Sequence, residues 1–133
     1  MDPEKSYEAR QAAILSQKDI NLVAIFDGKV IGLSDAGVSR LHQGSLIEGE
    51  VHSLYVDEDF RRMGVGKLLF QKQCDLLRQR GFETISIWSL KENTSARNFY
   101  IKINGALLDK EESFDVDGKE YPHVVYQWYF EEE

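Results

Sequence analysis

Hydrophobic and polar positions alternate along much of this 133-residue chain, and the alternation predicts six strands. A period of two residues places one face of a strand against a core. Asp27-Gly28 and Asp117-Gly118 each separate two such runs and predict tight hairpin turns. The predicted strands are Ile20–Phe26, Lys29–Val38, Leu46–Val56, Thr84–Leu90, Leu107–Val116 and Lys119–Phe130.

Helical spacing of apolar residues predicts two helices, and an N-terminal capping signal predicts a third. One runs from Val65 to about Arg80 and is ended by Gly81, and a shorter one runs from Thr94 or Ser95 to Ile103. Asp2 and Pro3 resemble an N-cap and a first-turn residue, which predicts a helix from there to about Gln17. Ser39–Gly44 is expected to be a loop. The order indicates an α/β fold with a mixed, largely antiparallel sheet flanked by helices, in one domain over residues 1–133.

The segment Leu54–Gln71, LYVDEDFRRMGVGKLLFQ, joins a predicted strand to a helix through a loop with two glycines. The first amides of a helix have no internal partner, and the helix dipole favours negative charge there. Glycine at 64 and 66 lets an anion approach the backbone. Leu69 stands where a dinucleotide fingerprint needs a third glycine, and Arg61 and Leu68 stand where a P-loop needs Gly and Ser or Thr.

The pattern Arg61-x-x-Gly64-x-Gly66 resembles the pyrophosphate loop of the GNAT superfamily of N-acetyltransferases. A second segment, NTSARNFYIKING from Asn93, resembles that superfamily's later motif and follows about 30 residues downstream. Gly105 fits this motif, but Ala106 stands where the family usually has an aromatic residue. The resemblance covers roughly Asn21 to Phe130 and implies a GNAT-like fold that lacks the usual first strand and first helix.

This resemblance implies an acetyl-CoA-dependent N-acetyltransferase that needs no metal. The acceptor would be a primary amine of a small cationic metabolite or of a peptide or protein. The shortened N-terminus leaves open a naturally open acceptor site, completion by another chain, or a truncated sequence. Acetyl-CoA would contact fifteen residues: Leu54, Tyr55, Val56, Arg61, Arg62, Met63, Gly64, Val65, Gly66, Lys67, Asn93, Ala96, Phe99, Tyr100 and Lys102.

The resemblance also suggests catalytic roles. Tyr100 matches the family tyrosine that protonates the departing thiolate, and a backbone N–H near Leu54 would stabilise the oxyanion. Glu50 lies eleven residues before Arg61, where family members with a glutamate base carry it. His52 shares the strand face of Glu50 by alternation and is a second candidate base. The aromatic residues Tyr121, Tyr126, Trp128 and Tyr129 either line an acceptor pocket or pack the sheet.

Charge and composition limit the classes of partner and the cellular compartment that fit this chain. The net charge is −7, which argues against nucleic acid and is compatible with a cationic substrate. No apolar stretch approaches the length of a membrane span. The single cysteine, Cys74, fits a reducing cytoplasmic setting and is expected to be a structural thiol. A homodimer is left open. The alternatives are a module that binds acyl-CoA without catalysis and an unrelated nucleotide-binding or interaction domain.

Overall fold

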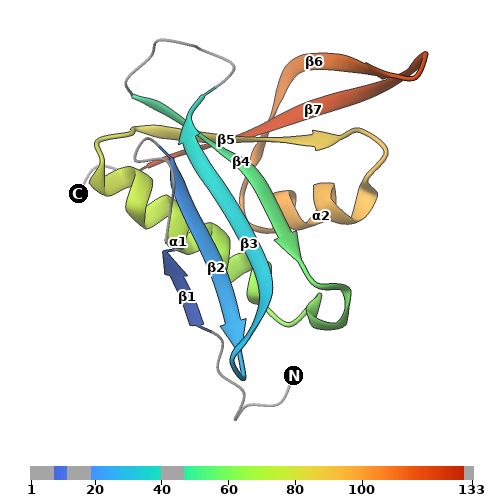
Figure 1. Ribbon diagram of the computed structural model, residues 1–133. Coiled ribbons are helices and arrows are strands. Elements are labelled where there is room, and N and C mark those ends of the chain that lie inside the picture. Colours follow the sequence, from blue (N-terminus) through green and yellow to red (C-terminus); the bar gives the residue numbers. More distant parts are fainter. Residues whose placement is uncertain (1–7, 12–18, 40–46, 131–133) are drawn as a thin grey trace.

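The computed structural model of the chain describes residues 8–11, 19–39 and 47–130. Within these ranges the strands form one seven-stranded sheet, ordered β1-β2-β3-β4-β5-β7-β6 (Figure 1). β4 and β5 pair in parallel, and every other neighbouring pair is antiparallel. The mixed, largely antiparallel sheet that the sequence predicts is therefore confirmed. The strands are β1 Glu8–Gln11, β2 Ile20–Phe26, β3 Lys29–Val38, β4 Glu48–Val56, β5 Thr84–Leu90, β6 Ala106–Val116 and β7 Lys119–Tyr129.

Both predicted hairpins form around left-handed residues. Asp27 and Gly28 have φ angles of 52° and 75°, and Asp117 and Gly118 have φ angles of 54° and 82°. Two consecutive residues with positive φ are what a type I′ turn requires, and such turns match the twist of the flanking strands. The first hairpin joins β2 to β3 and the second joins β6 to β7.

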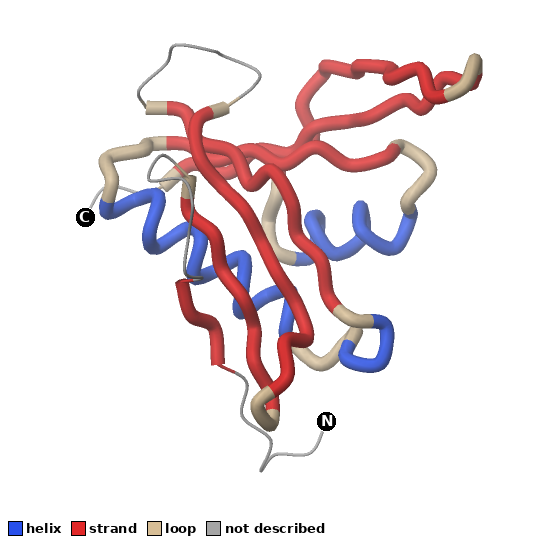
Figure 2. Tube along the Cα trace, viewed as in Figure 1, coloured by secondary structure: helices blue, strands red, loops and turns tan. Residues whose placement is uncertain are grey.

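The helices α1, Val65–Gln79, and α2, Thr94–Lys102, cover the same face of the sheet (Figure 2). Trp128 of β7 lies between them, with its ring centroid 4.6 Å from that of Phe70 on α1 and 6.2 Å from that of Tyr100 on α2. A short 3-10 helix, η1, spans Glu58–Phe60 in the β4–α1 connection.

Strand register assigns each side chain to one of two sheet faces, because successive residues alternate. The face covered by the helices, here called the helix face, carries the core: Leu22, Ala36, Val51, Ile87 and Tyr126 are each at most 3% exposed. The side away from the helices, here called the opposite face, carries Asn21, Asp35, Glu50, Ser86 and Trp88.

One buried polar side chain ties α1 to the sheet. Gln73 is fully buried, and its Nε2 donates to the carbonyl oxygens of Ser34, at 3.1 Å, and Ile20, at 3.3 Å. It also donates to Ser34 Oγ at 3.1 Å. Because a buried amide costs free energy unless it is hydrogen-bonded, these bonds fix the height of α1 above β2 and β3.

The N-terminal prediction needs correction. A helix was expected from Asp2 and Pro3 to about Gln17, but Glu8–Gln11 is strand β1, paired antiparallel with β2. The expected absence of a first strand is therefore wrong. The pairing of β1 is a long-range contact that local spacing does not encode, which explains the error. The remainder of that predicted helix lies outside the described residues.

The other element boundaries moved by one or two residues where they can be compared. β4 begins at Glu48, α1 ends at Gln79, α2 ends at Lys102 and β6 begins at Ala106. Apart from Ser39, the predicted loop Ser39–Gly44 lies outside the described residues, as does Leu46.

Gly105 is predicted to be required for packing at the end of α2. A Cβ on Gly105 would lie 2.6 Å from Trp128 Cζ2 and 2.9 Å from the backbone oxygen of Tyr100. Gly105→Ala should therefore lower the free energy of unfolding by about 1–3 kcal/mol, measured by urea denaturation. Gly66→Ala is the control, because a Cβ there meets its nearest atoms at 3.7 Å. Equal stability of the two variants would contradict this packing argument.

Candidate functional site

The sheet opens where β4 and β5 part. Their parallel ladder has four pairs, from Glu48–Thr84 to Val51–Ile87. Beyond it, β4 continues to Val56 alongside β3, whereas β5 continues to Leu90 alongside β7. Figure 1 shows the two strands diverging toward the η1 connection and α2. The second half of β4 therefore lies outside the β5 ladder.

The alternation of hydrogen bonds shows which β4 backbone groups face the parting. The Asp57 N–H donates to the Ile31 carbonyl at 2.7 Å, so Asp57 and Tyr55 direct their backbone groups toward β3. Leu54 and Val56, which alternate with them, direct their N–H and C=O groups away from β3. The Val56 carbonyl accepts a hydrogen bond from Arg61 Nε at 3.3 Å. The backbone of Leu54 and Val56 thus borders the space left by β5.

The connection that follows is a loop and not continuous helix. The Asp57 side chain caps η1 by accepting from the Asp59 N–H at 3.0 Å. Arg62 and Gly64 have left-handed φ angles of 63° and 85°. Turns of this kind direct neighbouring backbone N–H groups toward one concavity, which suits an anion.

The first amides of α1 follow directly. The helix begins at Val65, and the Leu68 N–H donates to the Gly64 carbonyl at 3.0 Å. The N–H groups of Val65, Gly66 and Lys67 come before this first bond, and no side chain caps the helix at Gly64. The strand, loop and helix N-terminus that the sequence predicts are all present.

Gly66 lies where three elements meet. A Cβ built on Gly66 would be 3.7 Å from Val56 Cγ2 of β4 and 3.7 Å from Phe99 Cζ of α2. Both distances are ordinary van der Waals contacts, so protein packing alone does not require glycine at this position. The helix start, the end of β4 and α2 nevertheless converge at Gly66, and a Cβ would lie between Val56 and Phe99.

Positive side chains surround this region on the helix face. Lys67 and Lys102 are exposed and border an open groove of about 510 Å³ between α1 and the end of α2. Arg61 and Arg62 are exposed in the preceding loop. The groove is lined by Lys67, Phe70, Gln71, Cys74, Asp75, Lys102, Ile103 and Asn104.

Tyr100 lies in an aromatic cluster on the helix face and is 7% exposed. Its ring centroid lies 5.6 Å from that of Phe99, 5.5 Å from that of Tyr126 and 6.2 Å from that of Trp128. Burial, with a smaller contribution from Tyr126, raises the pKa of the Tyr100 phenol to about 12. Tyr100 therefore keeps its proton throughout the neutral range.

Asn93 and Ala96 have a structural use at the start of α2. The Asn93 side chain is the N-cap of α2 and accepts from the Ala96 N–H at 3.1 Å. Ala96 and Phe99 are partly buried against the core.

Among the predicted cofactor residues, Tyr55 differs from its neighbours in β4, because its side chain lies on the opposite face and is 53% exposed.

The two candidate bases, Glu50 and His52, lie on the opposite face. Glu50 is fully buried, and it has an interaction partner within the chain. A bulge at His52 shifts the β3–β4 register between Asp35 and Ala36. His52 Nε2 lies 2.9 Å from the Val38 carbonyl oxygen. Since a carbonyl only accepts, Nε2 carries the hydrogen, and the lone pair of a neutral His52 is on Nδ1.

A polar network continues along this face beside the candidate bases. Asp35 accepts hydrogen bonds from Asn21 Nδ2 and, at 2.9 Å, from Ser53 Oγ. Asp19 Oδ1 and His52 Cε1 lie 2.6 and 3.3 Å from the position that a Cβ on Gly37 would take. Asp19 and His52 are therefore neighbours over the glycine backbone.

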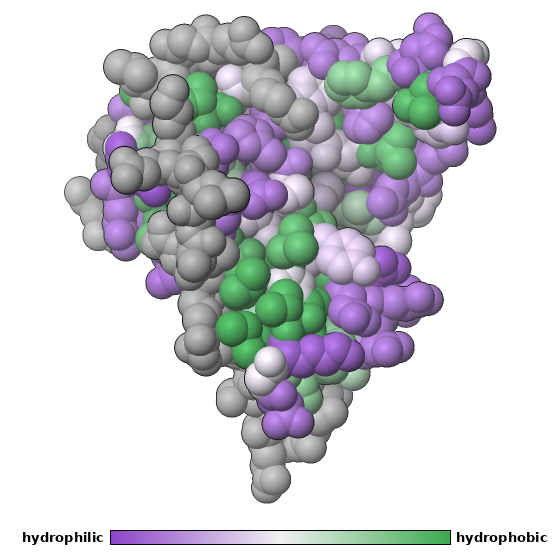
Figure 3. All heavy atoms as spheres, viewed as in Figure 1, coloured by the Kyte–Doolittle hydropathy of each residue, from purple (hydrophilic) through white to green (hydrophobic). Residues whose placement is uncertain are grey.

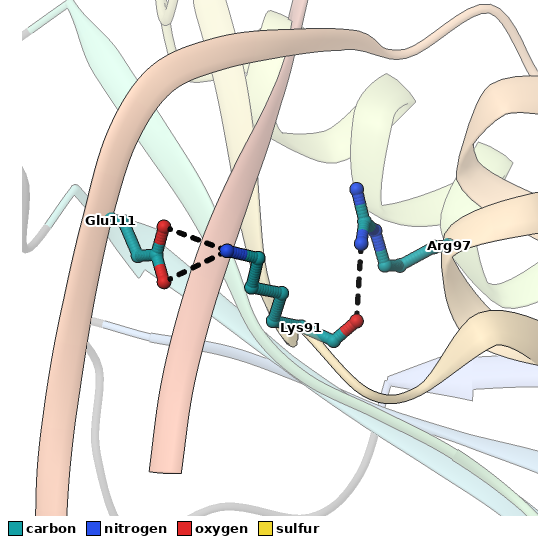
Figure 4. Close-up of polar contacts among 3 residues, drawn as sticks. All are labelled: Lys91, Arg97 and Glu111. Carbon is teal, nitrogen blue, oxygen red and sulfur yellow. Dashed lines mark hydrogen bonds and ion pairs between the residues drawn. The ribbon is translucent and has the colours of Figure 1, made fainter. Parts of the chain in front are cut away.

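Sequence reasoning missed Arg97. Its Nε donates to the Tyr126 hydroxyl at 2.9 Å, and its Nη1 donates to the Lys91 carbonyl at 3.1 Å. Figure 4 shows Arg97 directed at Lys91, whose ammonium pairs with Glu111 at 3.2 Å. Arg97 thereby links α2 to the buried Tyr126 and to the end of β5. Its place one turn before Tyr100 is a signal, since residues three or four apart share a helix face.

The predicted acceptor aromatics divide between the two faces. Tyr126 and Trp128 pack in the helix-face core, where the Trp128 indole N–H donates to the Ile103 carbonyl at 2.8 Å. Tyr129 is 71% exposed at the end of β7 opposite the start of β5, and Tyr121 lies in the β6–β7 hairpin.

Residues 1–106 match the sequence model of the family described as "Acetyltransferase (GNAT) family". The uncharacterized N-acetyltransferase YuaI of Bacillus subtilis is 29% identical over 101 residues, which are 76% of this chain and 57% of that protein. The protein named "Probable N-acetyltransferase camello" from Xenopus tropicalis is 30% identical over 103 residues, 77% of this chain and 43% of that protein. The matched part of this chain thus spans about half the length of these two relatives.

Solved structures share the fold. Ard1 from Thermoplasma volcanium superposes with a TM-score of 0.72 at 23% identity, covering 84% of this chain and 71% of that one. A GNAT family acetyltransferase from Elizabethkingia anophelis, with acetyl-CoA bound, superposes with a TM-score of 0.71 at 11% identity, covering 97% of this chain and 100% of that one. In the described part of this chain, no helix is long and apolar enough to cross a membrane.

Cys74 is predicted to be unreactive in the folded protein. Burial, with a smaller contribution from Asp75, raises the pKa of its thiol to about 12. At pH 8 the thiolate fraction should be about 1,000-fold lower than in the unfolded chain, and alkylation by iodoacetamide correspondingly slow. Protein unfolded in urea is the control. The raised pKa also stabilises the fold below about pH 9, and this contribution is lost as the pH rises toward 12. Rapid alkylation of native protein at pH 8 would contradict this assignment.

Proposed function

Because this chain belongs to the GNAT family of acetyltransferases, we propose that it transfers the acetyl group of acetyl-CoA to a primary amine. In this reaction the amine nitrogen forms a bond to the acetyl carbon, the carbon–sulfur bond breaks, the amine loses a proton and the thiolate gains one. We propose that the described residues, together with the rest of residues 1–133, act as one catalytic domain in the reducing cytoplasm, which the free Cys74 thiol supports.

The observation that carries the proposal is the parting of β4 and β5 beside the start of α1. The backbone of Leu54 and Val56 faces away from β3, and the ladder with β5 has ended at Val51. An extended ligand with amide groups can pair with such a strand, as a peptide does at a sheet edge. The unbonded amides of α1 lie at the end of the same strand and suit a pyrophosphate.

The other predicted contacts fit the same placement. Acetyl-CoA supplies an activated thioester, and its phosphates are anionic. Arg61, Arg62 and Lys67 supply positive charge at the loop and helix start, while Lys102 borders the groove beside α1. The left-handed conformation of Gly64 and the missing side chain of Gly66 leave the backbone accessible. Val56 at the end of β4 and Phe99 of α2 provide apolar contacts beside Gly66.

The residues of the opposite face would manage the amine proton. An alkylammonium has a pKa of about 10, so about one molecule in a thousand is nucleophilic at pH 7. His52 offers a lone pair on Nδ1, because Nε2 donates to the Val38 carbonyl. Glu50 is fully buried and so would act through an intervening water molecule. We therefore favour His52 as the direct base and Glu50 as a relay.

Tyr100 would serve the leaving group. Its Oη holds a proton at neutral pH because burial has raised its pKa to about 12. Tyr100 donates a hydrogen bond to the departing sulfur and supplies its proton. A thiolate in the same buried setting is also more basic than in water, which brings the two groups closer in proton affinity.

One observation favours the alternative of a non-catalytic module that binds acyl-CoA. Glu50, the base suggested by the family pattern, is 0% exposed, so direct contact with an amine would require movement. Such a module would still bind CoA through α1 and β4. A panel of primary amines, assayed by thiol release from acetyl-CoA, separates the two functions. If every amine releases thiol only at the background rate, the transferase proposal is rejected and the non-catalytic binding module is favoured.

Gly66→Ala should separate cofactor binding from folding. The Cβ fits between Val56 and Phe99 but takes up space beside the helix start. We expect CoA affinity to fall at least about tenfold by calorimetry, with stability unchanged or raised by up to about 1 kcal/mol. Gly81→Ala is the matched control at the other end of α1, where φ is 96°. It should lose stability and keep its CoA affinity. Wild-type CoA affinity in Gly66→Ala would place the phosphates elsewhere.

Tyr100→Phe should lower kcat by about 10- to 100-fold while the dissociation constant of acetyl-CoA stays within twofold. The reason is that the ring still packs against Phe99, Tyr126 and Trp128, and only the proton is lost. Steady-state kinetics with the best amine of the panel and calorimetry with acetyl-CoA measure the two effects. Tyr121→Phe, a tyrosine of the distal hairpin, is the control and should leave kcat unchanged. Unchanged turnover in Tyr100→Phe would assign the proton to another donor.

A further inference from the structure

Exposed apolar side chains border the parting of β4 and β5 on the opposite face. On the β4 side, Tyr55 is paired in register with Leu33, and they are 53% and 41% exposed. Figure 3 shows hydrophobic surface over the lower half of β2 and β3, where Leu33 and Val30 are exposed. This side of the opposite face is therefore apolar and accessible.

The β5 side carries Trp88 and Leu90. Both come after the last ladder pair, Val51–Ile87. Ile87 points into the core on the helix face, so by alternation Trp88 and Leu90 lie on the opposite face. Trp88 is half-buried and Leu90 is 39% exposed. Neither packs against the helix-face core. The two strands that part thus carry apolar side chains on the opposite face, Tyr55 on β4 and Trp88 and Leu90 on β5, and Leu33 extends the β4 side onto β3.

The charges near the parting differ between the two faces. The opposite face carries the carboxyl groups of Asp19, Asp35 and Glu50 beside His52. The helix face carries two lysines, Lys67 and Lys102, and one carboxyl group, Asp75, at the groove beside α1. An anionic cofactor is favoured on the helix face, and a cationic group is favoured on the opposite face.

We propose that the acceptor is a primary amine with an apolar group close to its nitrogen, and that Trp88 selects it. The acidic groups attract the ammonium, and the apolar group lies against Trp88 and Leu90 or Tyr55 and Leu33. A purely cationic amine such as a polyamine would leave these borders in water. The inference rests on the proposed function for its site and adds the chemical class of the acceptor. Either an arylalkylamine or the N-terminus of a peptide that begins with an apolar residue has this chemistry.

Two matched substrate pairs test the proposal. Phenethylamine is compared with ethylamine, and the peptide Phe-Gly-Gly with Gly-Gly-Gly. In each pair the amine is similar and the apolar group differs. We expect kcat/KM to be at least about tenfold higher for the apolar member of one pair, because burying such a group gives discrimination of this order. The pair with the larger ratio identifies the source of the amine, and equal values in both pairs overturn the proposal.

Variants assign the preference to Trp88. Trp88→Ala should reduce the ratio of kcat/KM within the preferred pair to about one, with the KM for acetyl-CoA unchanged, and Trp88→Phe should restore most of it. Leu90→Ser tests the same border if Trp88→Ala does not fold. Tyr129→Ala is the control, since Tyr129 is an exposed aromatic on the same face at the end of β7, beside Thr84 and away from the parting. An equal loss of activity toward both members of the pair in Trp88→Ala would overturn the assignment.

A binding measurement separates this proposal from the proposed function. The chain has two tryptophans, and Trp88→Phe assigns their indole N–H resonances. Phenethylamine, added to the CoA-bound protein, should shift the Trp88 resonance, and ethylamine should not. If this shift occurs without turnover of any amine, the acceptor class holds and the enzymatic function fails. If amines are acetylated and the Trp88 resonance does not move, the acceptor class fails and the enzymatic function holds.

Discussion

The structure depends on a four-residue parallel pairing between β4 and β5. This pairing joins two parts of the sheet, β1 to β4 and β5 to β7, each of which is held by antiparallel ladders of its own. Because β4 is paired along its other edge with β3, and β5 with β7, both strands stay extended after their shared ladder stops. The parting therefore costs only the hydrogen bonds of the missing parallel pairs. The backbone groups of Leu54 and the N–H of Val56 face the parting, and the Val56 carbonyl accepts from Arg61.

The core on the helix face keeps this arrangement rigid. Phe70 and Tyr100 contact Trp128 from two different helices, so α1, α2 and β7 share one aromatic junction. Gln73 adds a buried polar anchor between α1 and the strands β2 and β3. Val56 and Phe99 meet beside Gly66. The start of α1 is thus positioned by contacts with both parts of the sheet, and the loop before it inherits that position.

Local sequence signals were reliable where the structure is local. Asp27-Gly28 forms the predicted turn because both residues adopt positive φ, and Gly64 ends the loop before α1 with a left-handed φ of 85°. The edge strand at Glu8–Gln11 escaped prediction, since only its pairing with β2 makes it a strand. Alternation alone predicted that Glu50 and His52 share one face of the strand. The burial of Glu50 and the bulge at His52 depend on neighbouring strands, so the sequence pattern did not predict them. Trp88 became a candidate only when the register separated it from the core.

The two edges of the sheet are protected differently. One edge is the short strand β1, which has four residues. The other edge is β6, an eleven-residue strand whose side chains are almost all exposed. Its middle carries a run of charges, Asp109, Lys110, Glu111 and Glu112. Charged side chains on an edge strand oppose strand addition from a second molecule. Near the isoelectric point, about 5.0, the net charge of the chain approaches zero and repulsion between molecules weakens, so the same strand would template fibrillar association most readily in mildly acidic solution.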